Sequence, residues 1–323
     1  MSNEHFLVTG AAGCIGVWVL KNLVREGTPV SALDLDTQHH RLPLVLTDEE
    51  IARIQFIQGD VSDYPMVENA LKTSEANRII HLAALQLPFC KADPVAGAHV
   101  NVVGTVNIFE AAKRRGLNSL VYASSTAVYG LSEEYPDEPL PYDAPLKPRS
   151  HYGVYKQANE GSAAVSFRDD GISSIGLRPY VVYGAGRDQG MTSTPTKAIL
   201  AAAAGQPYKI SYGGRYCFQY ADDTAKAFIQ AARANFTGAQ VFNIGGDSVS
   251  TADVIAAIEQ AEPTARGRIT FDDIPLPFPP EVDNHALIDT IGPLAFTALV
   301  DGVAETLSIF RRGLAEGKIK AEA

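Results

Sequence analysis

The chain has 323 residues, enough for one large α/β domain with an appended lobe or for two domains. Hydrophobic residues make up 46% of it and charged residues 20%, which is ordinary for a globular protein. The formal net charge of -10 argues against a nucleic acid or an anionic membrane as partner, and no apolar run reaches the roughly 18 residues that a membrane span needs.

The cysteines and the N-terminus bear on the compartment. Cys14, Cys90 and Cys217 form an odd, sparse set without metal-ligand spacing. The first residues are polar, and Phe6-Leu7-Val8 is too short for the core of a signal peptide. We therefore expect free thiols in a reducing cytoplasm and no metal site.

The N-terminal residues have the order of a dinucleotide-binding βαβ unit. A short apolar strand, His5 to Thr9, runs into the glycine-rich turn Gly10-Ala-Ala-Gly13-Cys-Ile-Gly16. An amphipathic helix follows, and a second strand from Pro29 to Leu33 finishes at Asp34. The glycines permit a tight turn and a close approach of backbone N–H groups to a pyrophosphate, at the positive end of the helix. Asp34 would accept hydrogen bonds from the adenosine ribose, which favours NAD over NADP.

Further strands and helices alternate up to about residue 180. Strands are predicted at Ile54 to Ile57, from Arg78 towards Ala84, and at Ser119 to Ala123, with a long helical segment at about 93–115. Asp60 follows the third strand and either contacts the adenine or caps a helix. The hydroxyls of Ser124, Ser125 and Thr126 follow the fifth strand, where they either cap the backbone or contact a substrate.

Tyr152 and Lys156 are the candidate catalytic pair. They are four residues apart on a helix predicted to continue to about Arg168, so both lie on one helical face. A cation one turn away favours the phenolate and lowers the pKa of the tyrosine towards the working range. The alternative is a solvated pair without function. The Pro- and acid-rich segment 131–150 is predicted to be a long ordered loop over the site.

In the second half of the chain, predicted strands and helices no longer alternate regularly. A sixth strand is predicted from Ile172 to Arg178, after which Pro179 to Gly184 leaves the sheet. We expect a helix at 191–205, a short strand from Tyr208 to Tyr212, a helix from Asp222 to Ala234 and a return strand from Val241 to Ile244. Two more helices would flank the loop Pro275 to Pro280, which either lines the substrate cleft or only connects elements.

Eight motifs in register give the chain a family resemblance over about residues 5–250. They are Thr9-Gly10-x-x-Gly13-x-x-Gly16, Asp34, Gly59-Asp60-Val61, His81 to Ala84, Asn101 to Thr105, Ser124 to Gly130, Tyr152-x-x-x-Lys156 and Arg178-Pro179. Together they resemble the extended short-chain dehydrogenase/reductases of the NAD-dependent epimerase/dehydratase group.

The resemblance implies an α/β fold: a Rossmann-type doubly wound parallel sheet with a smaller C-terminal α/β substrate-binding lobe. Residues 1–180, with about 213–245, would form the NAD-binding domain and 181–323 mainly the lobe. Tyr152, Lys156 and Ser125 would be catalytic, Ser125 acting alone or with Ser124 or Thr126. The expected cofactor-binding residues are Gly10, Ala12, Gly13, Cys14, Ile15, Gly16, Asp34, Asp60, Val61, Leu82, Ala83, Ala84, Asn101, Ser124, Tyr152, Lys156, Tyr180 and Val182. The expected substrate contacts are Gln86, Ser125, Thr126, Tyr152, Arg187 and Arg215. A homodimer would form through the helices at about 93–115 and 151–168.

Two departures from the family pattern concern the substrate. Nucleotide-sugar members usually have asparagine at the position of Val181 and Arg-Asp at the position of Tyr216-Cys217. In those members both positions serve the nucleotide diphosphate, although Arg187 and Arg215 could compensate here. We therefore favour a small substrate whose secondary hydroxyl is oxidised, such as a sugar, a sugar acid or a related alcohol. The enzyme would be either a net dehydrogenase or an epimerase. The alternatives are a nucleotide-sugar epimerase or dehydratase and, more remotely, a non-catalytic NAD-binding regulator.

Overall fold

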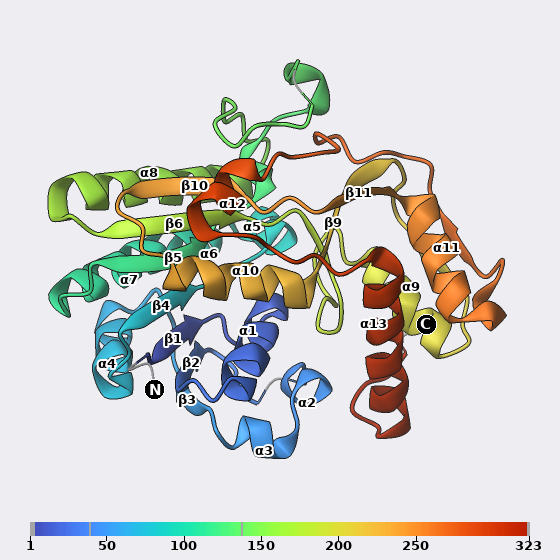
Figure 1. Ribbon diagram of the computed structural model, residues 1–323, viewed down its shortest axis with the longest axis horizontal. Coiled ribbons are helices and arrows are strands. Elements are labelled where there is room, and N and C mark those ends of the chain that lie inside the picture. Colours follow the sequence, from blue (N-terminus) through green and yellow to red (C-terminus); the bar gives the residue numbers. More distant parts are fainter. Residues whose placement is uncertain (1–3, 39, 137, 322–323) are drawn as a thin grey trace.

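The main feature of the fold is a parallel sheet of seven strands in the order β10-β6-β5-β4-β1-β2-β3 (Figure 1). The structure, a computed structural model, describes residues 4–38, 40–136 and 138–321. All six pairings in the sheet are parallel. The strands are β1 (Phe6–Thr9), β2 (Val30–Asp34), β3 (Gln55–Gln58), β4 (Arg78–His81), β5 (Ser119–Ala123), β6 (Ser173–Arg178) and β10 (Ala239–Asn243). This is the doubly wound sheet predicted from the sequence.

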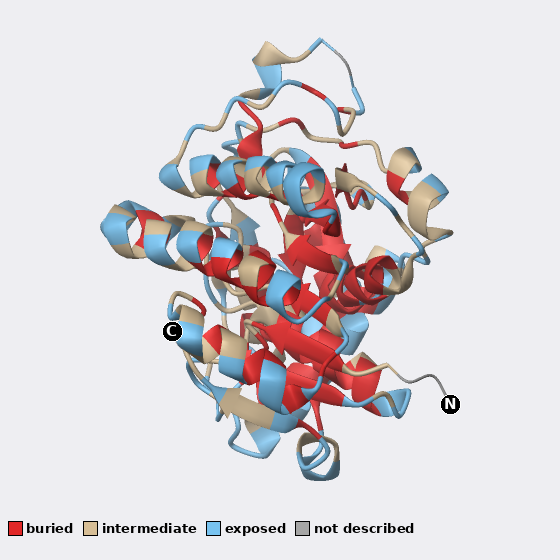
Figure 2. Cartoon of the chain, turned by 90° about the vertical axis from the view of Figure 1, so that its left-hand side faces the viewer, coloured by how far each residue is buried: buried red, intermediate tan, exposed pale blue. Residues whose placement is uncertain are grey.

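Alternate residues of the strands supply two separate hydrophobic cores. Phe6 and Val8 of β1 belong to one core, whereas Leu7 belongs to the other, because successive side chains of a strand point to opposite faces. Helices α1 (Cys14–Arg25) and α10 (Ala221–Arg233) pack together over the first face. Helices α4 (Tyr64–Ser74), α7 (Gly104–Arg114) and α8 (His151–Asp170) cover the second. The side of the molecule in Figure 2 shows helices with exposed outer faces in front of buried strands.

Two predicted segments, the helical segment 93–115 and the loop 131–150, differ from the expectation. Residues 93–115 are one helical path, but it consists of α6 (Pro94–Ala98), a π-helical turn at His99–Val103 and α7, preceded by α5 (Leu87–Ala92). The segment between β2 and β3 contains two short helices, α2 (Leu42–Val45) and α3 (Asp48–Ile51). The loop 131–150 pairs instead with the segment after the proline run, through the bridge between Leu140 and Val282.

The C-terminal lobe has more strands than the sequence indicated. Its three-stranded sheet joins β7 (Val181–Tyr183), β9 (Arg215–Tyr220) and β11 (Asp247–Ser250), and a second pair joins β8 (Tyr208–Ile210) to β12 (Ile269–Phe271). We had not expected β9, β11 or β12. The helices are α9 (Thr194–Ala203), α11 (Thr251–Ala261), α12 (His285–Ile291) and α13 (Leu299–Ala315). No helix in the described ranges is long and apolar enough to cross a membrane.

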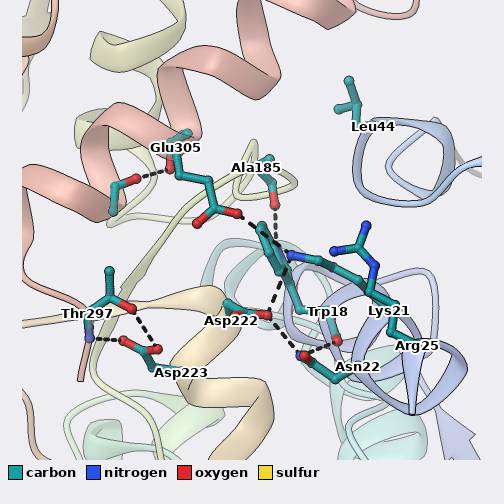
Figure 3. A network of polar contacts seen from close by, with 12 residues as sticks. Trp18, Lys21, Asn22, Arg25, Leu44, Ala185, Asp222, Asp223, Thr297 and Glu305 are labelled. Carbon is teal, nitrogen blue, oxygen red and sulfur yellow. Dashed lines mark hydrogen bonds and ion pairs between the residues drawn. The ribbon is translucent and has the colours of Figure 1, made fainter. Parts of the chain in front are cut away.

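Lys21 holds the first and the last long helix together (Figure 3). Its ammonium group lies 3.7 Å from Asp222 on α10, 3.8 Å from Glu305 on α13 and 3.9 Å from the centre of the Trp18 ring. The indole N–H of Trp18 donates to the carbonyl of Ala185, in the loop after β7, at 2.9 Å. These contacts fix the lobe and the loop at 184–186 relative to the helix that begins at the glycine-rich turn.

Candidate active site

A pocket of about 440 Å³ opens at the carboxyl ends of the parallel strands, where ligands bind in open α/β sheets. Most residues predicted for the site line it together: Gly10, Ala12, Gly13, Cys14, Ile15, Gly16, Asp34, Asp60, Val61, Leu82, Ala83, Ala84, Gln86, Ser124, Ser125, Thr126, Tyr152, Lys156, Tyr180, Val182 and Arg187. Asn101 and Arg215, both described in the structure, do not. Contrary to expectation, no described residue of 131–150 lines the pocket either, whereas Phe278 of the proline run does.

The glycine-rich turn presents a free helix end to this pocket. Gly10 has a positive φ of 64°, and a side chain there would meet the backbone of Ala83 at 2.5 Å, so only glycine fits between β1 and the end of β4. Gly13 precedes α1 and no side-chain hydrogen bond caps this end among the described residues. The first N–H groups of a helix bind anions well, and here they border the pocket.

Asp34 lies at the end of β2, beside the turn. Its carboxylate accepts a hydrogen bond from the backbone N–H of Ala12 at 2.9 Å and from that of Asp36 at 3.3 Å. The side chain is therefore fixed at the pocket wall, with further acceptor capacity for hydroxyl groups. An uncapped helix end and a carboxylate one strand away suit the pyrophosphate and the adenosine ribose of a dinucleotide.

Tyr152 and Ser125 meet because α8 packs closely on the turn after β5. Gly153 makes this approach possible, since a Cβ there would lie 2.2 Å from the carbonyl oxygen of Ala127. The Ser125 hydroxyl forms a hydrogen bond with the side chain of Tyr152 and also accepts one from the N–H of Ala127. Lys156 Nζ lies 5.7 Å from the centre of the Tyr152 ring and donates to the carbonyl of Ala123 at 2.6 Å.

The electrostatics of this pair differ from the expectation. Burial raises the pKa of Tyr152 above its usual value, and the hydrogen bond with Ser125 and the charge of Arg187 offset this only in part. Burial lowers the pKa of Lys156 to about 8, against the opposing effect of Cys90 and Glu160. In the chain alone, Lys156 thus does not lower the pKa of the tyrosine, because desolvation dominates and its ammonium group turns to Ala123.

A buried ion pair joins the elements that carry Tyr152 and Ser125. Arg178 at the end of β6 binds both carboxylate oxygens of Glu160 on α8, at 2.8 and 2.7 Å. Ser124 donates to the same carboxylate at 2.5 Å. Glu160 is one helical turn beyond Lys156, so this contact fixes the face of α8 that carries Lys156 and Tyr152. The Arg178-Pro179 motif pointed to Arg178, whereas no pattern in the sequence indicated Glu160.

Asn101 acts on the pocket from outside it. It is fully buried in the π-helical turn, where its amide accepts from the N–H of Leu85 at 2.7 Å and donates to the carbonyl of Leu85 at 2.9 Å. These two hydrogen bonds to the backbone of Leu85 hold the chain between Ala84 and Gln86, which line the pocket.

Two charged residues of the pocket wall, Arg41 and Asp188, were not identified from the sequence. Arg41, in the loop after β2, binds Asp188 with Nη2 at 2.5 Å and donates to the carbonyl of Ala12 at 3.3 Å. His40 contacts the same carboxylate at 2.8 Å. These contacts join the loop after β2 to the loop after β7 across the pocket. No local pattern in the sequence indicates such a contact between distant loops.

The residues at which the chain departs from nucleotide-sugar members lie away from the pocket surface. Val181 and Tyr216 are fully buried and are not among the lining residues, and the Tyr216 hydroxyl contacts Thr251 at 3.1 Å. Arg215 is exposed at the start of β9, where it contacts Ser248 and Asp253. None of the three offers a polar group to a ligand in the pocket.

Comparisons with known proteins agree with this geometry. Residues 6–245 match the model of the family described as NAD dependent epimerase/dehydratase. The chain is 31% identical to a UDP-glucose 4-epimerase of Mycolicibacterium smegmatis over 94% of this chain and 98% of that protein. The structure of MoeE5 in complex with UDP-glucose and NAD matches with a TM-score of 0.80 and 28% identity, over 96% and 100% of the chains. A partial-consensus L-threonine 3-dehydrogenase has the same TM-score and coverage at 22% identity, a likeness of fold alone.

We predict that replacing Lys156 by methionine makes stability less dependent on pH. The pKa of Lys156 is lowered from 10.5 to about 8. Between these values the unfolded chain binds more protons than the native one, so the native protein gains stability as the pH rises. The variant lacks this gain. Its stability relative to the native protein should therefore fall by about 2 kcal/mol between roughly pH 7 and pH 9.5 in urea unfolding without cofactor.

The control for this measurement is Lys72→Met, at an exposed lysine on α4. An equal pH dependence in both variants would show that the burial of Lys156 has no such effect.

Proposed function

Since the chain belongs to the NAD-dependent epimerase/dehydratase family and is an enzyme of the extended short-chain dehydrogenase/reductase type, we propose that it oxidises a secondary hydroxyl of a small molecule. The substrate would be a sugar, a sugar acid or a related alcohol. The observation that carries the proposal is the hydrogen-bonded pair of Tyr152 and Ser125, with Lys156 beside it, in the pocket that the glycine-rich turn borders.

NAD would be held by the chain's own groups along the pocket wall. The N–H groups at the start of α1 suit its pyrophosphate, and Asp34 suits the hydroxyls of its adenosine ribose. Lys156 would contact the ribose next to the nicotinamide. When bound, NAD supplies the acceptor for the hydrogen and the electron pair that leave the substrate carbon.

Tyr152 and Ser125 would handle the substrate oxygen. The Ser125 hydroxyl holds this oxygen, and the Tyr152 oxygen takes its proton as the carbonyl forms. The positive charge of Arg187 stabilises the negative charge of the phenolate that must exist before the proton moves. Release of the carbonyl compound gives a net dehydrogenase, and its reduction on the opposite face gives an epimerase.

Two observations bear on the size of the substrate. The buried Val181 and Tyr216 offer no group to a nucleotide diphosphate, which supports a small substrate. The similarity to a UDP-glucose 4-epimerase and to MoeE5, solved with UDP-glucose, favours a nucleotide-sugar epimerase as the second candidate. The shared fold decides nothing between them, since a likeness to L-threonine 3-dehydrogenase is equally close.

The test is a screen of the purified protein with NAD. We expect NADH formation or epimerisation with free sugars, sugar acids or small alcohols, and loss of at least about 100-fold in turnover in Tyr152→Phe, which cannot take the proton. The matched control is Tyr155→Phe on the same helix, whose hydroxyl only donates to the carbonyl of Pro94 at 2.8 Å. Turnover of UDP-sugars alone would favour the second candidate, and full activity of Tyr152→Phe would refute the assigned base.

The role proposed for Asp34 predicts a change in nucleotide preference. Asp34→Ala removes the acceptor for the ribose hydroxyls, so NAD should bind about 10- to 100-fold more weakly, the cost of one or two hydrogen bonds to a charged group. Binding of NADP, whose phosphate no longer meets a carboxylate, should change less. Calorimetric titration with both nucleotides measures this, with the exposed Asp36→Ala as control. Equal losses for NAD and NADP would contradict the assignment.

We also propose that the protein is a homodimer that pairs through α7 and α8. Both helices carry exposed valines, Val106 on α7 at 40% and Val154 and Val165 on α8 at 46% and 44%. Val95 of the preceding helix α6 is exposed at 69%. These valines lie on two neighbouring helices, and a partner would cover their exposed apolar surface.

Sedimentation should therefore give twice the mass of the chain. Val106→Glu combined with Val165→Glu should give a monomer, because it places buried charges in the contact. Val300→Glu, at an exposed valine of α13, should leave the dimer intact. A monomeric native protein would end the proposal.

A further inference from the structure

Arg187 lines the pocket from the loop between β7 and α9. It lines the same pocket as Tyr152, and its positive charge lowers the pKa of the Tyr152 phenol. Its side chain is held by neutral groups: Nη1 lies 3.3 Å from the amide oxygen of Gln86, and Nη2 lies 3.1 Å from the hydroxyl of Thr192. These two contacts orient the guanidinium but do not neutralise its charge.

The guanidinium has an unused, buried donor. Nε of Arg187 is buried and has no hydrogen-bond partner in the described part of the chain. A buried donor without a partner costs free energy. The residue as a whole is only partly buried and lines the pocket. A ligand with an acceptor and a negative charge would supply the missing partner.

Two other arginines near the pocket form ion pairs with carboxylates of the chain itself. Arg41 is paired with Asp188, and Arg178 is paired with Glu160. Arg187 directly precedes Asp188 in sequence, yet that carboxylate binds Arg41 and His40 instead. No carboxylate within the described ranges forms an ion pair with Arg187. The pocket thus contains one arginine whose counter-ion is missing.

We propose that Arg187 binds a carboxylate of the substrate, so that the protein acts on a hydroxy acid such as a sugar acid rather than on a neutral sugar. The planar guanidinium matches two carboxylate oxygens, and Arg187 and Tyr152 line the same pocket, so that one small substrate can contact both. This inference rests on the proposed oxidation of a small molecule and names its substrate class.

One other anion lies within reach. The charge of Arg187 also lowers the pKa of the Cys14 thiol, whose burial raises it to about 11, so the guanidinium is close to the glycine-rich turn. The pyrophosphate of NAD is therefore the second source of the same chemistry, and the experiment has to separate the two.

The experiment compares matched pairs of acid and neutral sugar: glucuronate with glucose, and galacturonate with galactose. In the native protein kcat/KM should be at least about 10-fold higher for the acid of a pair. In Arg187→Gln the value for the acid should fall roughly 100-fold. The value for the neutral sugar should fall less, because it loses only the effect of the charge on Tyr152, so the preference for the acid should disappear. Arg187→Lys keeps the positive charge but lacks the planar guanidinium with its two parallel N–H donors. This variant should recover part of the lost kcat/KM for the acid. Equal kcat/KM for acid and neutral sugar in the native protein would overturn the proposal.

Equilibrium binding separates this inference from the proposed reaction. Calorimetric titration of Tyr152→Phe, loaded with NAD, should show that glucuronate or galacturonate binds and that Arg187→Gln on the same background abolishes binding. Binding that depends on Arg187 without any turnover by the native protein would keep the anion site and reject the reaction. A loss of NAD affinity in Arg187→Gln, with binding of the acids unaffected, would assign Arg187 to the pyrophosphate and overturn the proposal.

Discussion

The buried ion pair between Arg178 and Glu160 is the contact on which the geometry of the site depends. It joins the end of β6 to α8, and through Ser124 it also includes the end of β5. Both side chains are less than one-tenth exposed, so removing either partner would leave a charge in the core at a cost of about 3–5 kcal/mol. The position of Tyr152 relative to Ser125 follows from this pair, because the two lie on elements that Glu160 connects. The geometry of the pocket thus relies on a carboxylate that does not line it.

Beside this ion pair, the pocket contains buried polar groups whose environment costs free energy. Lys156 is buried with a lowered pKa, Tyr152 is buried with a raised one, and Arg187 has a donor without a partner. Each is costly in the chain alone and each gains from a bound ligand. Such sites are common in enzymes, where stability is given up for a prepared arrangement of charges. The rest of the fold, including the contacts of Lys21 with two other helices, carries the stability that this arrangement lowers.

The first half of the fold follows from the sequence because its signals are local. The turn at Gly10, the acid at Asp34 and the pair Tyr152 and Lys156 all belong to short patterns with one structural explanation. The lobe was harder to predict: neither β9 nor β11 shows a clear alternating pattern, and packing against other strands makes them strands. Arg41 and Asp188 reach the pocket from loops far apart in sequence. Arg215 was expected there, but the pairing of β9 with β11 directs it to Ser248 and Asp253.

The position of β10 has a consequence for how the protein is made. This strand pairs with β6 at the edge of the large sheet, yet it follows most of the lobe's first half in the chain. On the ribosome, the first six strands emerge well before Ala239–Asn243, and β6 meanwhile presents an open edge of N–H and C=O groups. The edge of β6 therefore stays unpaired and open to non-native pairing until β10 has been synthesised. Chaperones that shield strand edges, and slow stretches of translation before residue 239, would be expected to change the yield of this protein more than that of a sheet completed in chain order.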